Sequence, residues 1–476
     1  MSQGVNMTIT TKTQWLLTDP PMLADYSLDT WEHLPREEVD ALQLAGLKQR
    51  FTQLRDAIPM LSKLANAEGV VSIDSVDDVI PLLFDHTMYK SYPPSLLENN
   101  RFQQINKWLA KLTLHPVEDV DVSHCQGIDE WLQVMDAALP ELRISHSTGT
   151  SGTVSFLPHS QSEIDKSGAM KQMSVWNLGG PLRGERPELH VAYPFFRSGC
   201  SAHARGNDGV VKHLLRGEEY FHAAYPAKMS SDVLYLSARI KGAQAKGTLD
   251  RLKVSPAILA RKEEHDALQT KMPAHLKQFF EHISQELRGK RIYAWATWNM
   301  LHNMAKAGLE AGLEGVFAAD SYVSTGGGTK GLVQPPGWRE DILRFTGARQ
   351  LHELYAMSEV LTTHMRCEHG HYHLSHLAIP FQLDPQTSQP LPRHGRVTGR
   401  AAFFDLGADS RWGGFISGDE ITIEWDQPCT CGRTSRYIVG EVQRYSEKNG
   451  GDDKITCAGT ESAHQEAMDF LNNLGE

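Results

Sequence analysis

Several features that would assign this sequence to a class at once are missing from it. Its 476 residues include only six cysteines, too few for a scaffold held together by disulfides. No apolar run is long enough to span a bilayer. The first residues, MSQGVNMTITTKTQ, lack the basic start and apolar stretch of a secretory signal. We therefore expect a cytoplasmic protein that is kept reduced and has no membrane partner.

Positive charge is also scarce, with 47 Lys and Arg against 58 Asp and Glu and a formal net charge of −11. An acidic surface repels phosphate backbones, so nucleic acid is not an expected partner. Hydrophobic residues make up 40% of the chain and charged residues 22%, which is typical of a globular protein with a sizeable core. The length fits about three average domains or one large α/β body with an appendage.

Segments of helical and strand character alternate along most of the chain. Leu47, Phe51, Leu54 and Ile58 recur at helical spacing, and residues 128–139 and 162–176 read as helices, the second with Ser162 as its N-cap. The predicted strands are residues 141–145, 189–193, 233–236, 291–295 and 315–317. From about Tyr372 the pattern changes to short strands and turns, such as 401–405 and 420–425. This order favours an α/β fold with substantial parallel sheet.

A loop rich in glycine and hydroxyl groups follows the predicted strand 141–145. It consists of Ser147, Thr148, Gly149, Thr150, Ser151 and Gly152, followed by Thr153. Glycines bring backbone N–H groups close to an anion, and hydroxyls add hydrogen bonds to phosphate oxygens. The Gly-Lys-Ser/Thr ending of a Walker loop is absent. A phosphate-binding loop is the functional interpretation, and a polar surface turn is the alternative.

Three more segments carry polar or glycine-rich patterns that are weak one by one. Residues 324–331, STGGGTKG, contain three successive glycines, against which a flat ring or a phosphate can lie without meeting a Cβ. Residues 354–359 read LYAMSE, and residues 416–420 read ISGDE. A Ser-Glu pair is usually a helix start and Gly-Asp is usually a turn.

Taken in order, these segments and the later Cys-x-Cys-Gly-Arg at 429–433 resemble the superfamily of adenylate-forming enzymes. Within it, the sequence is most similar to the phenylacetate–CoA ligase branch and to the acyl-protein synthetases that supply fatty acids for luminescence. Residues 326–330, the Cys367-x-x-Gly-x-Tyr-His373 segment, and Ser446-Glu447 with Gly450-Gly451 carry the second likeness. The resemblance covers roughly residues 85 to 460.

The resemblance implies roles for particular residues in the attack of a carboxylate on the α-phosphate of ATP. The loop 147–153 is expected to wrap the β- and γ-phosphates, and Tyr355 to stack on adenine. Ser358 is expected at the α-phosphate, Glu359 at a Mg²⁺ ion, and Asp419 at the ribose hydroxyls. The residues expected along adenine are Gly326, Gly327, Gly328 and Thr329.

The sequence departs from the superfamily pattern where cations are expected. The loop is not followed by the usual Lys, and Gly440-Glu441 stands where the superfamily has Gly-Arg. Arg436 is our candidate for the missing cation, with Arg444 as the alternative. Lys454, or else Lys330, is the candidate for the lysine that approaches the carboxylate.

The resemblance also implies a domain plan. We expect a helical N-terminal segment over residues 1–84 and an adenylation domain over 85–440, built of helix-flanked sheets with a small β-barrel-like part. Residues 441–476 are expected to be a rudimentary C-terminal tail, because after Lys454 only 476 − 454 = 22 residues follow. That is too short for the rotating C-terminal domain of typical members.

Three cysteines and a histidine form a separate constellation. Cys367, His373, Cys429 and Cys431 supply three thiolates and one imidazole, a set that suits tetrahedral Zn²⁺. Some relatives of phenylacetate–CoA ligase look to carry zinc at this place. Alternative ligands are crowded into the same region: His369, His371 and His376. The other interpretation is four ordinary residues on neighbouring loops.

Two further features concern the acid and the acceptor. The acyl-protein synthetases accept the acyl group on a late cysteine, and here Cys457 is either such an acceptor or an inert buried residue. An aromatic set falls where relatives build the acid pocket, and core packing is the alternative for each member: Tyr193, Phe195, Phe196, His203 and Trp295.

The sequence thus predicts a ligase that uses ATP and Mg²⁺, with Zn²⁺ as a candidate second metal, to activate an aryl or apolar carboxylic acid as its adenylate. The acyl group is then expected to pass to a thiol or amine, on a protein or a small molecule. Two alternatives stay open: a ligase with CoA as acceptor, and an accessory subunit that binds nucleotide without turnover.

Overall fold

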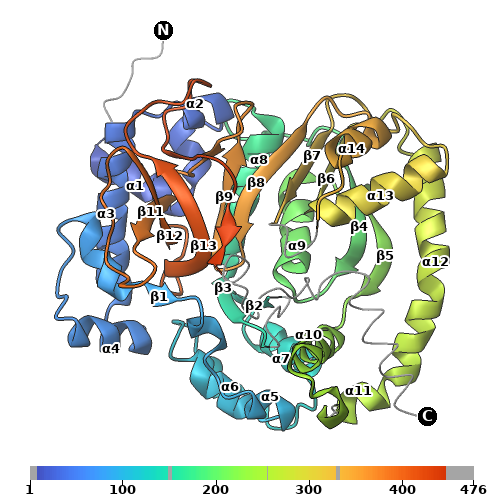
Figure 1. Cartoon of the computed structure of the whole chain (residues 1–476), viewed down its shortest axis with the longest axis horizontal. Helices are drawn as coiled ribbons and strands as arrows, with labels where there is room; N and C mark the ends of the chain where they lie inside the picture. The colour runs from blue at the N-terminus through green and yellow to red at the C-terminus, as the bar shows by residue number, and fades with distance from the viewer. Residues whose placement is uncertain (1–7, 148–152, 253, 255, 328–332, 446–476) are drawn as a thin grey trace.

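The structure is a computed structural model that describes residues 8–147, 153–252, 254, 256–327 and 333–445. Among these residues the strands form one large mixed sheet of 13 strands and a separate two-stranded hairpin (Figure 1). The predicted α/β class is confirmed, with helices beside the sheet and a strongly curved antiparallel part at one end.

The parallel part of the sheet has the order β5-β4-β6-β7-β8. Its strands are β4 (His190–Ser198), β5 (Phe221–Lys228), β6 (Ile292–Thr297), β7 (Tyr322–Gly326) and β8 (Leu351–Met357). Because these strands run in one direction, their carboxyl ends meet at one edge of the sheet, where ligands commonly bind in open α/β sheets.

The antiparallel part begins at β9 (Val360–Arg366), which returns beside β8 after a two-residue turn. It continues through β10 (Tyr372–His373) and β14 (Tyr437–Ile438) to β13 (Gly414–Glu424), β12 (Arg396–Asp405) and β11 (Ala378–Leu383). Two short strands, β1 (Phe84–Asp85) and β15 (Gln443–Arg444), also pair with β13. The change of pattern predicted from about Tyr372 corresponds to this region, which curves like part of a barrel (Figure 1).

Helices pack along the parallel strands. They are α8 (Gln161–Trp176), α9 (Ala202–Leu214), α12 (Lys262–Gln285), α13 (Trp298–Glu310) and α14 (Trp338–Thr346). The predicted helix at 162–176 is α8, but its N-cap is Ser160, whose hydroxyl accepts from the N–H of Glu163. Buried side chains of the strands and of α12 to α14 form one core cluster that contains Val191, Ile292 and Val323.

The N-terminal helices pack on the antiparallel part of the sheet. They are α1 (Ile9–Thr18), α2 (Leu28–Glu32), α3 (Arg36–Leu54) and α4 (Pro59–Ala67). Phe51 of α3 contacts Trp412 edge-on, with ring centroids 6.2 Å apart. Ile58, predicted as the last member of one helical face, lies just before α4, because Pro59 begins a new helix there. The predicted boundaries at residues 84 and 440 stay predictions.

A third group of elements lies below the sheet in Figure 1. It contains α5 (Ser95–Glu98), α6 (Phe102–Leu109), α7 (Ile128–Ala138), α10 (Ser231–Lys246), α11 (Pro256–Ala260) and the hairpin of β2 (Leu142–His146) and β3 (Phe156–Ser160). Helices α7 and α10 cap each other: Asp232 accepts from the N–H of Ile128 at 2.7 Å, and Asp129 accepts from the N–H of Ser231 at 2.8 Å.

The structure corrects two predicted strands. Residues 233–236 belong to α10, whose apolar run is buried on several sides and so resembles a buried strand in the sequence. Residues 315–317 are not a sheet strand: the N–H groups of Val316 and Phe317 bond to carbonyls at the end of α14. The strand that precedes the triple glycine is β7.

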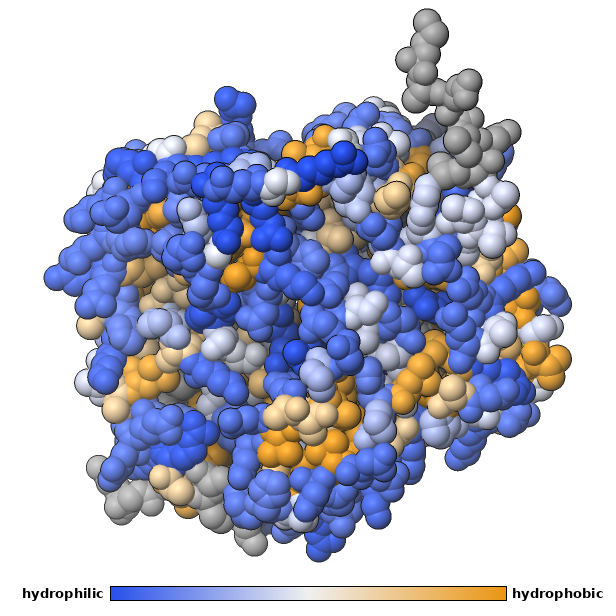
Figure 2. All heavy atoms as spheres, turned by 180° about the vertical axis from the view of Figure 1, so that it is seen from behind, coloured by the Kyte–Doolittle hydropathy of each residue, from blue (hydrophilic) through white to orange (hydrophobic). Residues whose placement is uncertain are grey.

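Short 3₁₀ turns connect these elements: η1 (Pro20–Ala24), η2 (Val76–Leu82), η3 (Met88–Lys90), η4 (Val117–Asp119), η5 (Glu218–Tyr220) and η6 (Leu249–Arg251). The face seen from behind is mostly hydrophilic, with apolar residues in separate groups (Figure 2). Within the described part of the chain, no helix combines the length and the apolar character needed to cross a bilayer.

Candidate functional site

The turn between β8 and β9 carries Ser358 and Glu359 at the carboxyl edge of the parallel strands. Gly326 and Gly327 lie at the end of the adjacent β7, where Gly326 pairs with Leu354. A Cβ on Gly326 would lie 2.8 Å from the Leu354 carbonyl oxygen, so β7 and β8 approach too closely there for any other residue. Gly327 has a φ of +86°, which an L side chain rarely adopts. The predicted Gly328 and Thr329 lie outside the described residues.

Asp419 lies on β13 across from this turn. Its carboxylate accepts a hydrogen bond from the Tyr355 hydroxyl at 2.8 Å, and Arg444 Nε lies 3.4 Å from its other oxygen. The side chain is nearly buried, with the residue 8% exposed. Burial and the neighbouring Asp419 charge raise the pKa of Tyr355 well above its usual value, so the phenol stays a donor. The structure therefore brings two predicted site residues, Tyr355 and Asp419, into direct contact.

The Tyr355 ring is itself buried against protein. Its centroid lies 5.7 Å from that of His364 and 6.2 Å from that of Phe403. The predicted stacking of Tyr355 on adenine stays a prediction. The Tyr355 hydroxyl donates a hydrogen bond to Asp419 and so holds that carboxylate in place.

Glu359 is half-buried, and both positively and negatively charged side chains act on it. Burial raises the pKa of Glu359, Arg444 and Lys90 act to lower it, and Asp419 raises it. Glu359 thus lies within electrostatic reach of a second carboxylate and of two cations, an arrangement suited to holding a metal ion and phosphate oxygens. Lys90 was not predicted from the sequence, because it stands 57 residues before Ser147 in a short 3₁₀ turn with no motif of its own.

The predicted phosphate loop lies in the sequence between β2 and β3, which pair as a hairpin. Ser147 closes its base: the Ser147 Oγ accepts from the N–H of Ser155 at 2.9 Å, and the Ser147 N–H donates to the Ser155 carbonyl at 3.0 Å. The residues of the tip, Thr148, Gly149, Thr150, Ser151 and Gly152, lie outside the described residues.

The segment from η3 to Tyr92 connects the hairpin to Glu359. The Tyr92 hydroxyl donates to the Val154 carbonyl at 2.7 Å, and two residues earlier Lys90 acts on Glu359 electrostatically. This segment therefore bonds to the base of the hairpin and carries a charge that acts on Glu359.

Arg436, our sequence candidate for the missing cation, lies elsewhere. Its guanidinium forms two bonds to Asp40 on α3, at 2.6 and 2.8 Å, and lies over the Trp425 ring. Arg444 instead pairs with Asp419, because β15 lies directly beside that part of β13. Between the two residues left open by the sequence, the structure thus brings Arg444 to Asp419. Lys454 lies outside the described residues.

A buried ionic cluster lies behind these segments. Arg411 is fully buried, with Nε 3.0 Å from Glu163 and Nη2 3.4 Å from Asp405. Asp405 in turn accepts from the N–H of Leu361, two residues after Glu359, at 3.0 Å. The Arg411 charge lowers the pKa of Glu163 strongly despite its burial. The start of α8 and the strand after Glu359 are therefore joined through Arg411.

The four predicted zinc ligands lie together beside β10. One ligand atom from each of Cys367, His373, Cys429 and Cys431 falls within 4.8 Å of all the others. The Cys367 and Cys429 sulfurs are 3.9 Å apart, and Cys431 Sγ is 3.2 Å from His373 Nε2. The His373 Nδ1 faces Ser435 Oγ at 3.0 Å. Of the alternative ligands, His371 has Nδ1 3.2 Å from Cys429 Sγ, and His376 bonds to the Trp31 carbonyl.

Local turns bring these ligands together. The Gly370 N–H bonds to the Cys367 carbonyl and the Gly432 N–H to the Cys429 carbonyl, and both glycines have positive φ, +78° and +90°. Each cysteine segment therefore reverses tightly enough to turn its side chains towards one point.

The aromatic set predicted near the acid pocket is largely core. Tyr193, Phe195 and Phe196 are all nearly buried within the cluster between the sheet and its helices. The Tyr193 and Trp295 ring centroids are 5.0 Å apart, and those of Phe195 and Phe196 are 4.9 Å apart. The rings mostly pack against one another, which is the alternative that the sequence left open.

The geometry was compared with known proteins. No family model and no curated protein matches the sequence. A solved structure of 2-hydroxyisobutyryl-CoA ligase, with 2-HIB-AMP and CoA in the thioesterification state, is similar at a TM-score of 0.50 and 14% identity, covering 87% of this chain and 70% of that one. The same ligase in an open conformation gives a TM-score of 0.48 at 14% identity, covering 87% and 72%.

ATP-bound MatB from Rhodopseudomonas palustris is a more distant match, with a TM-score of 0.35 at 12% identity, covering 63% of this chain and 47% of that one. The likeness at a TM-score of 0.50 concerns the fold, at an identity too low to carry function. The fold expected from the resemblance is confirmed at this level: the chain shares the fold of 2-hydroxyisobutyryl-CoA ligase.

Proposed function

We propose that this protein activates a carboxylic acid with ATP, forming an acyl-adenylate and releasing pyrophosphate. One observation carries the proposal: Glu359, Asp419, Tyr355, Arg444 and Lys90 converge at the carboxyl edge of the parallel strands, beside the base of the hydroxyl-rich hairpin. Transfer of the adenylyl group of ATP to a carboxylate needs positioning and charge neutralisation more than a protein nucleophile, and this junction supplies both.

The proposed roles follow the chemistry of each group. Asp419, paired with Arg444, accepts hydrogen bonds from the ribose hydroxyls. The hairpin tip from Ser147 through Gly152 binds the β- and γ-phosphates, and Ser358 contacts the α-phosphate. The adenine lies along residues 326–329 and Tyr355. Glu359 holds Mg²⁺, which supplies positive charge against the phosphate oxygens.

Lys90 and Arg444 take the place of the cations that the sequence lacks at the expected positions. Both act on Glu359 electrostatically, so positive charge is present on the phosphate side of the site without a Lys in the loop. Lys454 remains our proposed contact to the reacting carboxylate.

In the proposed step, a carboxylate oxygen of the acid attacks the α-phosphorus of ATP. The new bond joins that oxygen to phosphorus, and the bond from phosphorus to the bridging oxygen of the β-phosphate breaks. Pyrophosphate leaves with the electron pair, and no proton is transferred. We further propose a thiol as acceptor, either that of CoA or that of a protein cysteine such as Cys457, because thiolates accept acyl groups readily.

The test is exchange of labelled pyrophosphate into ATP, measured across a panel of aryl and aliphatic carboxylic acids. We expect exchange that depends on the acid, lowered on the order of 10²-fold or more in Glu359→Gln because charge stabilisation is lost. Glu340→Gln, at an exposed position on α14, is the matched control and should exchange like the wild type. Tight ATP binding with no exchange for any acid would instead favour a nucleotide-binding accessory protein.

We also propose that Cys367, His373, Cys429 and Cys431 bind one Zn²⁺. In a tetrahedral site with Zn–S of about 2.3 Å, sulfurs lie ~3.8 Å apart, and the Cys367–Cys429 distance is 3.9 Å. Ser435 would orient His373 through its other ring nitrogen, as outer ligand partners commonly do. The ion would join the end of β9 to the loop before β14 and thus stabilise the fold.

Metal analysis of protein purified without chelator tests this site. We expect close to one zinc per chain in the wild type and a large loss in Cys429→Ser, with Cys125→Ser, a buried cysteine outside the cluster, as control. A wild-type protein without zinc, even after refolding with added Zn²⁺, would exclude the site.

A further inference from the structure

His146, the last residue of β2, joins the base of the hairpin to two distant elements. Its N–H donates to the Cys200 carbonyl, at 3.1 Å, in the loop after β4. Its ring nitrogens face two oxygens: Nδ1 lies 2.9 Å from the Ser147 carbonyl oxygen, and Nε2 lies 3.0 Å from Ser231 Oγ at the start of α10. His146 is 2% exposed, so the ring makes these contacts inside the protein.

The two ring contacts fix the tautomer of His146. A carbonyl oxygen can only accept a hydrogen bond, so Nδ1 carries a proton and donates it to Ser147. Burial lowers the pKa of His146, which favours the neutral ring with a single N–H. Nε2 is therefore an acceptor, and the Ser231 hydroxyl donates to it.

Ser231 is held in turn by α7. Its backbone N–H donates to the Asp129 carboxylate at 2.8 Å. That carboxylate also accepts from the Ser230 hydroxyl, and its second oxygen lies 3.3 Å from the Arg261 guanidinium. Ser231 therefore presents its hydroxyl to His146 from a backbone that is anchored to α7.

Ser147 begins the predicted phosphate loop, and each of its polar groups has a partner. Its N–H and Oγ bond to Ser155 across the hairpin, and its carbonyl bonds to the His146 ring. The first two bonds close the hairpin, whereas the third connects it to α10 through the imidazole. Because a peptide group is planar, the direction of the Ser147 carbonyl sets the direction in which the chain leaves this residue.

We propose that His146 is a positioning residue for ATP, which fixes the Ser147 carbonyl and thereby orients the loop that binds the β- and γ-phosphates. This inference rests on the proposed function. A backbone loop binds phosphate tightly when its N–H groups are directed at the ligand in advance, because ordering them on binding lowers the affinity. Ser231 and Asp129 act through the imidazole.

Two substitutions separate the two ring contacts. In His146→Asn the side-chain amide stands near Nδ1 and can still donate to Ser147, whereas in His146→Gln it stands near Nε2 and can still meet Ser231. Each variant keeps one buried bond and loses the other, so both should lower the urea midpoint by a similar amount. In pyrophosphate exchange, the KM for ATP should rise about 5- to 20-fold in His146→Gln and stay within about twofold in His146→Asn. A KM in His146→Gln no higher than in His146→Asn would overturn the positioning role.

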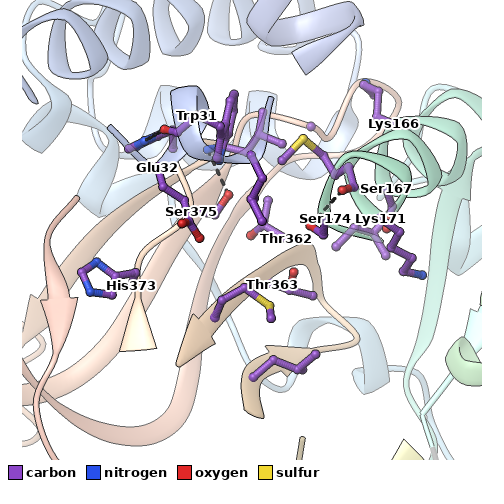
Figure 3. A pocket seen from close by; sticks show the side chains of 18 of the residues that line it. Trp31, Glu32, Lys166, Ser167, Lys171, Ser174, Thr362, Thr363, His373 and Ser375 are labelled. Atoms are coloured by element: carbon purple, nitrogen blue, oxygen red, sulfur yellow. Dashed lines mark hydrogen bonds between the residues drawn. The ribbon is translucent and has the colours of Figure 1, made fainter. Parts of the chain in front are cut away.

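Thr362 provides the matched control for changing a buried polar side chain. It lies on β9, at the wall of a cavity behind β8 and β9 that α2 and α8 also line (Figure 3). Its Oγ1 is buried and has no hydrogen-bond partner among the described residues. Thr362→Val therefore removes a buried hydroxyl without breaking a bond, and its KM for ATP should match the wild type. A rise equal to that in His146→Gln would mean that any buried polar change alters the KM, which would overturn the inference.

Calorimetry with two nucleotides tests the same role without turnover. AMP lacks the β- and γ-phosphates, so His146→Gln should bind α,β-methylene-ATP about 5- to 20-fold more weakly than the wild type and bind AMP equally well. The same loss for both nucleotides would overturn the inference. A wild type that binds the ATP analogue but exchanges pyrophosphate with no acid would overturn the proposed function alone, and the difference between the nucleotides would still decide the role of His146. A wild type that binds neither nucleotide would overturn both.

Ser231→Ala keeps the imidazole and guards against misfolding of His146→Gln. Without the hydroxyl donor, the tautomer with the proton on Nδ1 loses its support, and the KM for ATP should rise about two- to fivefold. The same substitution should add nothing in His146→Gln, where Ser147 has already lost its bond. An unchanged KM in Ser231→Ala, or the same rise in both backgrounds, would overturn the inference.

Discussion

At the scale of single residues, the Asp419 carboxylate is held in position by two neighbouring side chains. Tyr355 and Arg444 come from different elements, β8 and β15, and each contacts a different oxygen of the same carboxylate. Two donors on different oxygens hold the carboxylate in one orientation. The motif around Asp419 was visible in the sequence, but Arg444 was one of two candidates until β15 was found beside β13.

We expect Asp419→Asn to weaken ATP use. The amide retains the shape but loses the charge that Arg444 faces, and bonds to a charged group contribute about 1.5–3 kcal/mol. The KM for ATP in pyrophosphate exchange should therefore rise about 10- to 100-fold. Asp250→Asn, at an exposed position on η6, serves as control. An unchanged KM for ATP in Asp419→Asn would remove this residue from the nucleotide site.

At the scale of elements, Arg411 joins parts of the chain that the sequence keeps far apart. It lies between Glu163 at the start of α8 and Asp405 at the end of β12, and Asp405 holds the backbone of β9. No local pattern revealed this cluster, because a single Arg, Glu or Asp is ordinarily a surface residue. Its existence depends on three elements packing at one place.

Arg411→Met should destabilise the fold strongly. Removing one partner of a buried ionic cluster leaves carboxylates uncompensated and costs about 3–5 kcal/mol. Urea unfolding should show a lower midpoint with an unchanged slope, whereas Arg349→Met, on the surface before β8, should leave the midpoint within error. A midpoint like that of the wild type would mean that the cluster contributes little.

At the scale of the whole molecule, buried histidines make stability depend on pH. Burial lowers the pKa of His364 to about 3 and that of His376 to about 4. His364 Nδ1 accepts a bond from the N–H of Ser375, which protonation would break. The unfolded state binds these protons near pH 6.5, so stability is complete above that pH and falls as the pH decreases. Burial and the neighbouring Asp129 raise the pKa of Asp232 to about 7. This shift acts in the opposite direction, because it favours the folded state as the pH decreases.

The contribution of His364 to this pH dependence of stability can be isolated with a variant. Between pH 7 and 5 the wild type should lose about 2 kcal/mol through His364 alone, and His364→Gln should lack that part of the decrease. The measurement is urea unfolding at both pH values, with His394→Gln, an exposed position, as control. If His364→Gln loses as much stability between pH 7 and 5 as the wild type, His364 is not the group responsible.

Some properties of this protein are local and follow from the sequence by itself. Periodicity placed α7, α8, β2 and β6 closely, and glycine and hydroxyl spacing marked the segments at 147–152, 326–329 and 416–420, because turns and amphipathic faces depend on near neighbours. The four cysteine and histidine ligands were also predicted and do converge.

Other properties depend on burial and on which distant elements meet: the helical state of residues 233–236, the choice of Arg444 over Arg436, the charge of Lys90 near Glu359, and a cavity behind β8 and β9. Tertiary packing decided these, since each arises from contacts between residues far apart in the chain.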